Sequence, residues 1–282
     1  MSEVSEPFVN IAGYRFVAIP DRVEMRFPLR DFCVDLDLKG TILLSGEGIN
    51  FFLSGQEDAT DQFIARLDGD ERFRNIPLKV SRSNKQPFNR MLVRLKKEII
   101  SIGLDEVKPA EFTGPHIPPL EFKEWLDEGR EVAILDTRND YELRMGKFEG
   151  AIDLDISSFR DFPTAIESLP ESMKEKPVVM YCTGGIRCEK ASAVMLNAGF
   201  KDVRQLKGGI LGYFEQCGGV HWDGECFVFD RRVGVDSELN ETGTVVCFEC
   251  REPLTEQEQE SEHYRIGEWC PYCISAAGAA AD

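Results

Sequence analysis

The segment Pro177–Ser192 reads PVVMYCTGGIRCEKAS and decides the fold of the middle of the chain. Its first part, Val178–Tyr181, is a short apolar run of strand-forming residues, which predicts a buried parallel strand. The composition of Glu189–Leu196 favours a helix, and Cys182–Arg187 (CTGGIR) forms a six-residue loop between the two. A glycine-bearing loop that joins a strand to a helix directs backbone N–H groups and the positive helix end to one point.

Cys182 stands at the start of this loop, and Arg187 closes it. A thiol held at such a point is stabilised as the thiolate, and the arginine adds a positive charge. Cys182 is therefore predicted to be a nucleophile or a sulfur carrier. The alternative is a buried structural cysteine after a buried strand. Four residues separate Cys182 from Arg187, one fewer than in cysteine-based phosphatases, so the loop suits a single sulfur better than a phosphate.

The candidate catalytic residues are Cys182, Arg187 and Cys188, and the loop contributes Thr183, Gly184, Gly185 and Ile186. Cys188 follows Arg187 directly. It is either a partner thiol for a persulfide on Cys182 or a small core residue in the first turn of the helix. The sequence leaves both interpretations of Cys188 open.

Composition limits the classes of protein to consider. A chain of 282 residues predicts two or three domains with a sizeable core. No run of 18 apolar residues is present and the first ten residues are acidic and polar, so neither a membrane span nor a signal peptide is predicted. Nine cysteines without an export signal indicate a reducing, cytoplasmic location, where cysteine serves chemistry or metal binding.

The net charge of −17 argues at first against a nucleic-acid partner, but residues 72–97 differ from the rest of the chain. They contain no acidic side chain, and Phe73 and Phe88 lie among the cations, the mixture expected for RNA phosphates and a stacked base. The alternative is pairing of these cations with acidic residues elsewhere in the chain. The candidate RNA-binding residues of this basic segment are Arg72, Arg74, Lys79, Arg82, Lys85, Arg90, Arg94, Lys96 and Lys97.

The first 105 residues have the strand and helix order of a ferredoxin-like sandwich, βαββαβ. Asp21 is expected to cap the first helix, and Pro28 to kink or split it. The predicted elements are a strand at 14–19, a hairpin of 40–44 with 49–53, a helix at 58–67, and final strand material at 78–80 and 91–100. Such a sheet leaves one face open, and the basic segment falls largely on its last strand.

The overall prediction is a multidomain chain of α/β and α+β type. It comprises a ferredoxin-like domain at 1–105, a Pro-rich linker at 106–119, an α/β domain with a central parallel sheet at 120–228, and a Cys-rich tail at 229–282. In that tail two Cys-x2-Cys pairs lie 19 residues apart, a spacing typical of a structural zinc site. Redox thiols are the alternative, and His263 is a possible substitute ligand. The predicted ligands are Cys247, Cys250, Cys270 and Cys273.

Motifs on both sides of the loop carry a family resemblance. Leu135–Arg138 (LDTR), Tyr141-Glu142 and Gly146–Ala151 (GKFEGA) precede it, and Gly199-Phe200 and Leu206–Ile210 (LKGGI) follow it. With the Cys182 loop, they resemble the rhodanese domain, with Lys147 in place of its usual His. Over about residues 12–273 the chain is similar to the bacterial rhodanese-domain tRNA uridine hydroxylases, on the basis of GEGIN at 46–50, YCTGGIRCEKAS at 181–192, FVFDRR at 227–232 and the Cys-rich tail.

This resemblance implies oxygen-dependent conversion of the wobble uridine, tRNA position 34, to 5-hydroxyuridine, with Cys182 as the active residue. The implied partner is the tRNA anticodon region, with O2 as co-substrate and no obligate protein partner. The oxygen-activating cofactor stays unknown, because no two-His-one-carboxylate spacing and no G-x-G-x-x-G fingerprint is visible. The loop alone equally suits a sulfurtransferase that passes a persulfide from Cys182 to an acceptor. A non-catalytic binding module is the third possibility.

Overall fold

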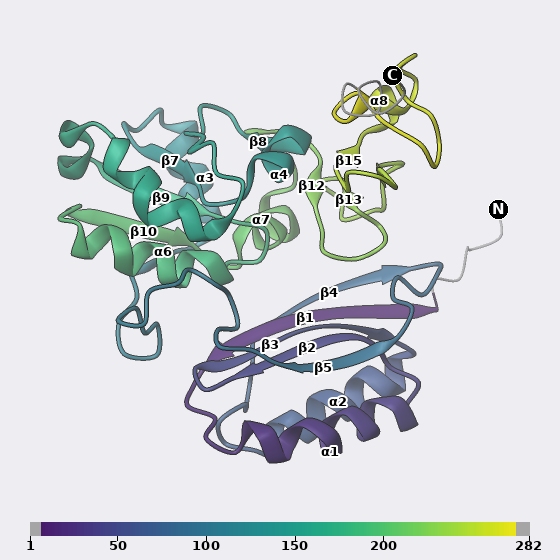
Figure 1. Cartoon of the computed structure of the whole chain (residues 1–282). Helices are drawn as coiled ribbons and strands as arrows, with labels where there is room; N and C mark the ends of the chain where they lie inside the picture. The colour runs from purple at the N-terminus through teal and green to yellow at the C-terminus, as the bar shows by residue number, and fades with distance from the viewer. Residues whose placement is uncertain (1–6, 275–282) are drawn as a thin grey trace, which may run out of the picture.

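The computed structural model describes residues 7–274 as two α/β domains and a small tail (Figure 1). The N-terminal sheet has helices on one face, and the middle domain and the tail lie over its other face (Figure 1). No helix within residues 7–274 combines the length and the apolar character that crossing a membrane requires.

The N-terminal domain is a five-stranded sheet in the order β4-β1-β3-β2-β5, with two helices packed on it. The first four strands have the ferredoxin-like order, which confirms the predicted fold class. Strands β1 and β3 contribute alternate buried residues such as Ile11, Phe51 and Leu53 to the core beneath the helices. The elements are β1 (Phe8–Phe16), α1 (Arg22–Asp35), β2 (Lys39–Ser45), β3 (Gly48–Gly55), α2 (Glu57–Asp68), β4 (Leu78–Ser83) and β5 (Met91–Leu95).

Two details of this domain differ from the sequence prediction. The first strand is Phe8–Phe16 rather than 14–19. The predicted final strand material forms two strands on opposite edges, because β4 pairs antiparallel with β1 whereas β5 pairs parallel with β2. The cations of residues 72–97 are therefore divided between both edges of the sheet.

Two expectations for α1 were wrong, namely the side-chain cap by Asp21 and a split of the helix at Pro28. Asp21 makes no capping hydrogen bond, because its carboxylate binds the guanidinium of Arg72 instead. Pro28 does not split the helix, which runs unbroken from Arg22 to Asp35. Pro28 is exposed, so water can hydrate the carbonyl that lacks its N–H partner. Leu29 and Cys33 still reach the core from the other side of the helix.

The middle domain has a four-stranded parallel sheet in the order β6-β10-β9-β7, and apolar clusters pack on both of its faces. This confirms the predicted parallel-sheet domain. Its elements are β6 (His116–Ile117), α3 (Pro119–Asp127), β7 (Ala133–Asp136), α4 (Asp140–Met145), β8 (Gly146–Phe148), α5 (Phe162–Ala165), β9 (Pro177–Tyr181), α6 (Ile186–Asn197), β10 (Asp202–Leu206) and α7 (Gly209–Cys217), with 3-10 turns at Phe159–Asp161, Ile166–Ser168 and Glu171–Glu175.

The segment predicted to be a linker is attached to this sheet. Strand β6 pairs with β10, and Ile102 and Val107 are buried in the same cluster as Val178 of β9. Four prolines and a glycine keep most of 106–119 irregular. Its apolar side chains nevertheless hold it against the middle domain.

The tail consists of short strands and one helical turn. Strand β11 extends the middle domain by pairing with β8, and the following strands form two small two-stranded sheets. Leu254 and the four tail cysteines form the small core of its end. The elements are β11 (Trp222–Gly224), β12 (Cys226–Phe227), β13 (Gly234–Val235), β14 (Val245–Val246), β15 (Pro253–Leu254) and α8 (Glu256–Gln259).

Candidate active site

Cys182 lies directly after β9, at the carboxyl end of a central parallel strand, where open α/β sheets place their ligands. Helix α6 begins at Ile186, so Ile186 and Arg187 belong to its first turn and the loop proper is shorter than predicted. Gly185 precedes the helix with φ of 102°, a left-handed conformation that favours glycine. Its N–H donates to the Cys182 Sγ at 3.1 Å.

The next helix fixes the orientation of the loop. The N–H groups of Ile210 and Leu211 donate to the carbonyls of Cys182 and Thr183 at 2.9 and 3.1 Å. A Cβ at Gly209 would lie 2.3 Å from the Cys182 carbonyl oxygen, so only glycine permits this approach. Because the loop carbonyls face α7, the N–H of Gly185 is left to face the sulfur.

The environment favours the thiolate form of Cys182. Burial raises the pKa of this thiol, since Cys182 is only 1% exposed. The hydrogen bond from Cys188, the charge of Arg187 and the N–H groups of Arg187 and Gly185 together outweigh burial and lower the pKa to about 6. A thiolate at neutral pH is the reactive form for nucleophilic attack or sulfur transfer.

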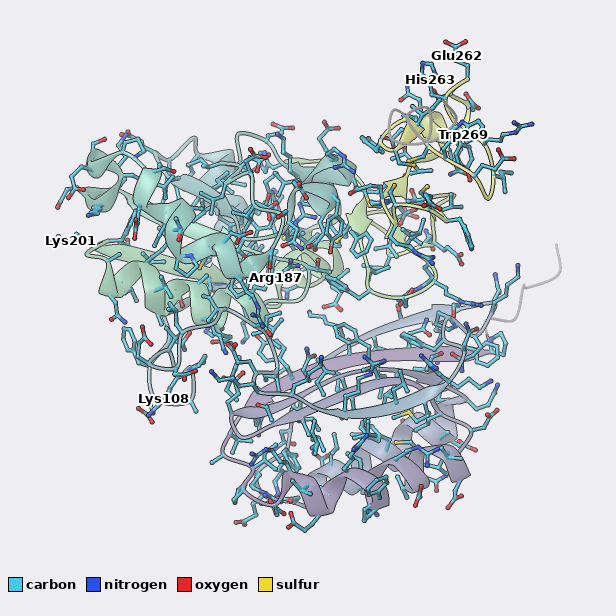
Figure 2. The ribbon with its side chains drawn as sticks, viewed as in Figure 1. Lys108, Arg187, Lys201, Glu262, His263 and Trp269 are labelled. Carbon is cyan, nitrogen blue, oxygen red and sulfur yellow. The ribbon has the colours of Figure 1, made fainter. Side chains whose placement is uncertain are left out.

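Arg187 is held by a partner that the sequence analysis did not select. Its guanidinium makes a two-pronged ion pair with the Glu142 carboxylate, at 2.5 and 2.7 Å, and both side chains are buried. Figure 2 shows Arg187 on the side of the middle domain that faces the N-terminal sheet. Glu142 belongs to the Tyr141-Glu142 motif, and its carboxylate also accepts the N–H of Asn139, the N-cap residue of α4, at 3.2 Å. An Asn followed three residues later by Glu is the sequence signal for this contact.

Cys188 lies beside Cys182 inside the protein. It is fully buried, and burial followed by its hydrogen bond to Cys182 raises the pKa of its thiol. Its sulfur also lies 3.7 Å from the hydroxyl of Thr137. The structure thus places Cys188 in the core beside Cys182, which is compatible with both interpretations that the sequence left open.

The N-terminal domain reaches the loop through Tyr14 of β1. The Tyr14 hydroxyl donates to Glu189 at 3.1 Å and lies 3.1 Å from where a Cβ at Gly185 would be. Burial and the nearby Glu189 and Cys182 charges raise the Tyr14 pKa, so its hydroxyl keeps its proton. Glu189 in turn accepts from Thr113 and lies 3.4 Å from the ring of His116. Sequence reasoning missed Tyr14, because nothing in its local pattern indicates a contact 175 residues away.

Lys190 forms a second link between the two domains. It is 1% exposed, and its ammonium lies 2.9 Å from Glu47 of the β2–β3 turn and 2.7 Å from Glu98, which follows β5. The GEGIN motif and the CTGGIRCEK motif, far apart in the sequence, thus meet at one buried ion cluster. This contact holds helix α6, which follows the Cys182 loop, against the N-terminal domain.

The nine cations of the basic segment have unequal environments. Five of them pair with carboxylates: Arg72 with Asp21 and Asp70, Arg74 with Glu71, Lys79 with Glu215, Arg82 with Glu57, and Lys97 with Asp105. Within the part of the chain that the structure describes, the other four are exposed and make no ion pair: Lys85, Arg90, Arg94 and Lys96. Phe73 packs in the core at 1% exposure and cannot stack on a base, contrary to expectation, whereas Phe88 is half-buried.

The tail brings its four cysteines together. All four sulfurs lie within 4.8 Å of one another, and three of the separations are 3.5, 3.7 and 3.9 Å. Four thiolates at about 2.3 Å from one tetrahedral metal ion would be about 3.8 Å apart, so the residues fit such an ion. His263 lies at the outer end of the tail and is not part of the cluster (Figure 2).

Comparison with known proteins agrees with this architecture. A family model for a UPF0176 acylphosphatase-like domain matches residues 8–99, and one for a rhodanese-like domain matches residues 118–216. The tRNA uridine(34) hydroxylase of Cupriavidus necator is 48% identical over 278 residues, which cover 97% of this chain and 99% of the relative. This chain belongs to the tRNA uridine(34) hydroxylase family.

A second curated relative matches this chain over the same extent. The protein of that name from Ralstonia nicotianae is 46% identical, again over 97% of this chain and 99% of its own length. Among solved structures, the rhodanese-like domain of an Anabaena protein is 26% identical and covers 39% of this chain and 79% of its own, with a TM-score of 0.33. The two relatives thus match nearly the whole of this chain.

Proposed function

We propose that this protein hydroxylates the wobble uridine at position 34 of tRNA to 5-hydroxyuridine, with O2 as co-substrate. The observation that carries the proposal is the Cys182 thiolate, held at the end of β9 by the Gly185 N–H and the Arg187 charge. Curated relatives that match nearly the whole chain are named for this activity. Together they favour a nucleophilic cysteine acting on a tRNA base.

The chemistry we assign to Cys182 is addition to the uracil ring. The thiolate sulfur bonds C6, the C5–C6 double bond opens, and the electron pair moves to C5 and the C4 carbonyl oxygen. The electron-rich C5 then bonds one oxygen atom of O2, and the other oxygen atom leaves as water after accepting two electrons and two protons from a two-electron reductant. Loss of the C5 proton and departure of the thiolate afterwards restore the ring double bond and free Cys182. The Cys188 thiol, which hydrogen-bonds to Cys182, stabilises the departing thiolate.

Binding of the anticodon region is assigned to the exposed cations of the basic segment. Lys85, Arg90, Arg94 and Lys96 have no described carboxylate partner, so each is available for a phosphate. The five cations with carboxylate partners contribute less, because binding RNA would first break their ion pairs. An overall acidic protein can therefore bind RNA through a local cationic surface.

The metal in the tail is assigned as a structural zinc ion, bound by Cys247, Cys250, Cys270 and Cys273. The donor set of four thiolates suits zinc, and the sulfur separations fit tetrahedral coordination. The apolar core of this region is small, so bound metal would stabilise its fold. All four positions are filled by protein, so this ion has no open position for a substrate.

Nucleoside analysis of tRNA after incubation with the protein under labelled O2 tests the function. We expect 5-hydroxyuridine with one heavy oxygen atom from the wild type and none from Cys182→Ser, which still binds tRNA. The isotope is needed because adding oxygen and replacing oxygen by sulfur change the nominal mass equally. Thiolated uridine without the label would instead support the sulfurtransferase that the rhodanese-like loop also suits. Full hydroxylation by Cys182→Ser would refute the proposal.

A further inference from the structure

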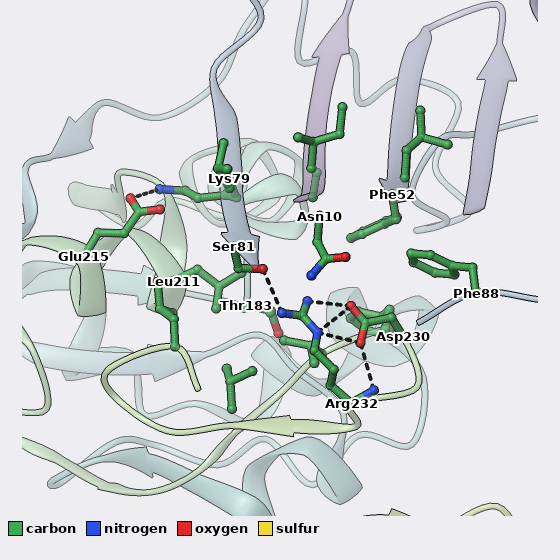
Figure 3. Close-up of a pocket in the computed structure, with 18 residues that line it drawn as sticks. Asn10, Phe52, Lys79, Ser81, Phe88, Thr183, Leu211, Glu215, Asp230 and Arg232 are labelled. Carbon is green, nitrogen blue, oxygen red and sulfur yellow. Dashed lines mark hydrogen bonds and ion pairs between the residues drawn. The ribbon is translucent and has the colours of Figure 1, made fainter. Parts of the chain in front are cut away.

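A cleft between the N-terminal sheet and the segment after β12 lies next to the catalytic loop (Figure 3). We propose that this cleft receives the target uridine base of the tRNA after the base has left its stack in the anticodon loop. This inference rests on the proposed function and adds the place where the base is bound. It assigns to Phe52, Phe88 and Phe229 the role of stacking against the base.

The walls of the cleft come from both domains. Asn10, Ala12, Phe52 and Phe88 line it from the N-terminal domain, and Thr183, Val228 and Phe229 from the other side. Figure 3 shows Phe52 and Phe88 next to each other on one side, with Asp230 and Arg232 opposite them. An apolar, aromatic lining with a few polar groups is the usual composition of a site for a flat organic ring.

The cleft borders the loop that carries Cys182. Thr183, which lines it, is the residue directly after Cys182, and its hydroxyl lies 3.4 Å from both the Glu142 carboxylate and the Phe227 carbonyl. The Phe229 ring lies 5.7 Å from the Arg187 guanidinium and 6.2 Å from the Phe52 ring. Phe229 therefore stands between the cleft and the Arg187–Glu142 pair that supports the thiolate.

The charges around the cleft suit RNA. Its two acidic groups are already paired, Asp230 with Arg232 at 2.6 Å and Glu215 with Lys79 at 2.8 Å, so neither presents an uncompensated negative charge to a nucleotide. The loop that carries Phe88 also carries Lys85 and Arg90, both exposed and without a described carboxylate partner. A base placed against Phe88 would thus have cations on both sides for its flanking phosphates.

A single-stranded RNA base is the occupant that fits these features together. Sequence-specific proteins bind RNA mostly through unpaired loop bases stacked on aromatic rings. The amide of Asn10 lies at the cleft wall, where one of its N–H groups donates to the Ser83 hydroxyl at 3.1 Å and the second is left to donate to a ring edge. Arg232 binds the Ser81 hydroxyl at 2.7 Å and so joins the two walls at this point.

Binding of a fluorescent anticodon stem-loop to the full-length protein tests the cleft without relying on activity. The RNA carries the pyrimidine analogue pyrrolocytidine at position 34, and a second RNA carries it at position 33. We expect a change of emission on binding only for position 34. Phe229→Leu, which keeps an apolar side chain but removes the ring, should weaken that RNA's affinity about tenfold, as for loss of one base–aromatic stack.

Phe88→Ala should have a similar effect from the opposite wall, and Phe27→Ala is the matched control. Phe27 is 59% exposed on α1, which packs on the other face of the sheet, so its variant should bind like the wild type. Unchanged binding by both Phe229→Leu and Phe88→Ala, or an equal emission change at position 33, would overturn the proposal. Nucleoside analysis of natural tRNA separates the two ideas: a position-34 signal with no hydroxylation would remove the proposed function but leave the cleft assignment in place.

Discussion

Two opposing effects act on the sulfur of Cys182, and the balance between them determines its chemistry. Burial favours the neutral thiol, whereas the Cys188 hydrogen bond, the Arg187 charge and two backbone N–H groups favour the thiolate. The sequence was sufficient to predict the cysteine, the loop and the arginine, because strand, glycines and helix follow one another locally. It could not show that Glu142 neutralises Arg187, since that contact spans 45 residues.

The titration of Cys182 is therefore a direct prediction. The ultraviolet absorbance of the thiolate, taken as wild type minus Cys182→Ser, should rise with a midpoint near pH 6, the value to which its pKa is lowered. Arg187→Gln should move the midpoint upwards. Because an unfolded cysteine has a pKa of about 8.5, the free energy of unfolding that Cys182 contributes should increase as pH rises from about 6 to about 8.5. A titration midpoint near pH 8.5 in both the wild type and Arg187→Gln would contradict this account.

Glu142→Gln tests how much the Arg187–Glu142 ion pair contributes to stability. It leaves the buried Arg187 charge without its carboxylate, which typically costs about 3–5 kcal/mol of unfolding free energy. Denaturant unfolding measures the loss. Glu131→Gln is the control, because its pair with Lys176 is exposed, and we expect little change there. Equal stability of both variants would mean that the Arg187–Glu142 pair contributes nothing net.

At the scale of elements, the sequence predicted the helices and strands that are determined by interactions between residues close together in the chain. The order of strands and helices, the β2–β3 hairpin and the helix after Cys182 all follow from short-range periodicity and turn residues. The placement of β5 beside β2 did not follow, because nothing near Met91–Leu95 shows which sheet edge it joins. Pro28 was misjudged for the same reason: its effect depends on whether that face of α1 meets water, which only packing determines.

The tail gives a prediction at this scale. Purified protein should contain about one zinc ion per chain, and a chelator that removes it should make residues beyond 240 sensitive to protease while the middle domain stays resistant. Cys270→Ser should reduce the zinc content strongly, because it removes one of four buried or half-buried sulfurs. Cys217→Ser, at the end of α7 and outside the cluster, should keep its zinc. A metal-free tail with equal protease resistance would contradict the zinc assignment.

At the scale of the whole molecule, the sequence predicted the domains but not how they meet. The open face expected for the N-terminal sheet is partly an interface: Tyr14 contacts Glu189, Phe52 lies against Phe229, and Ser81 binds Arg232. These partners are more than 150 residues apart, so no periodicity or spacing could indicate them. Lys79 of the basic segment pairs with Glu215 across this interface, whereas the other paired cations of the segment bind carboxylates that precede the middle domain.

Lys190→Met tests whether the buried ion cluster couples the two domains. The variant leaves Glu47 and Glu98 facing each other without the ammonium between them, which should cost about 3 kcal/mol of unfolding free energy at neutral pH. Burial raises the pKa of Glu98, and at present Lys190 and two backbone N–H groups outweigh that and lower it. Without Lys190 the Glu98 pKa should rise above its unfolded value.

The folded variant would then bind more protons than the unfolded chain at mildly acidic pH, so its stability deficit should shrink as pH falls from about 7 to about 5. Denaturant unfolding of wild type and variant at both values measures this. Lys108→Met, whose pair with Glu111 is exposed, should show no such dependence on pH. Because Lys190 also holds α6 against the N-terminal domain, the variant should hydroxylate tRNA more slowly even where it is fully folded. An equal loss of unfolding free energy at both pH values would show that water hydrates the carboxylates of Glu47 and Glu98 when Lys190 is absent. The ion cluster would then not couple the two domains.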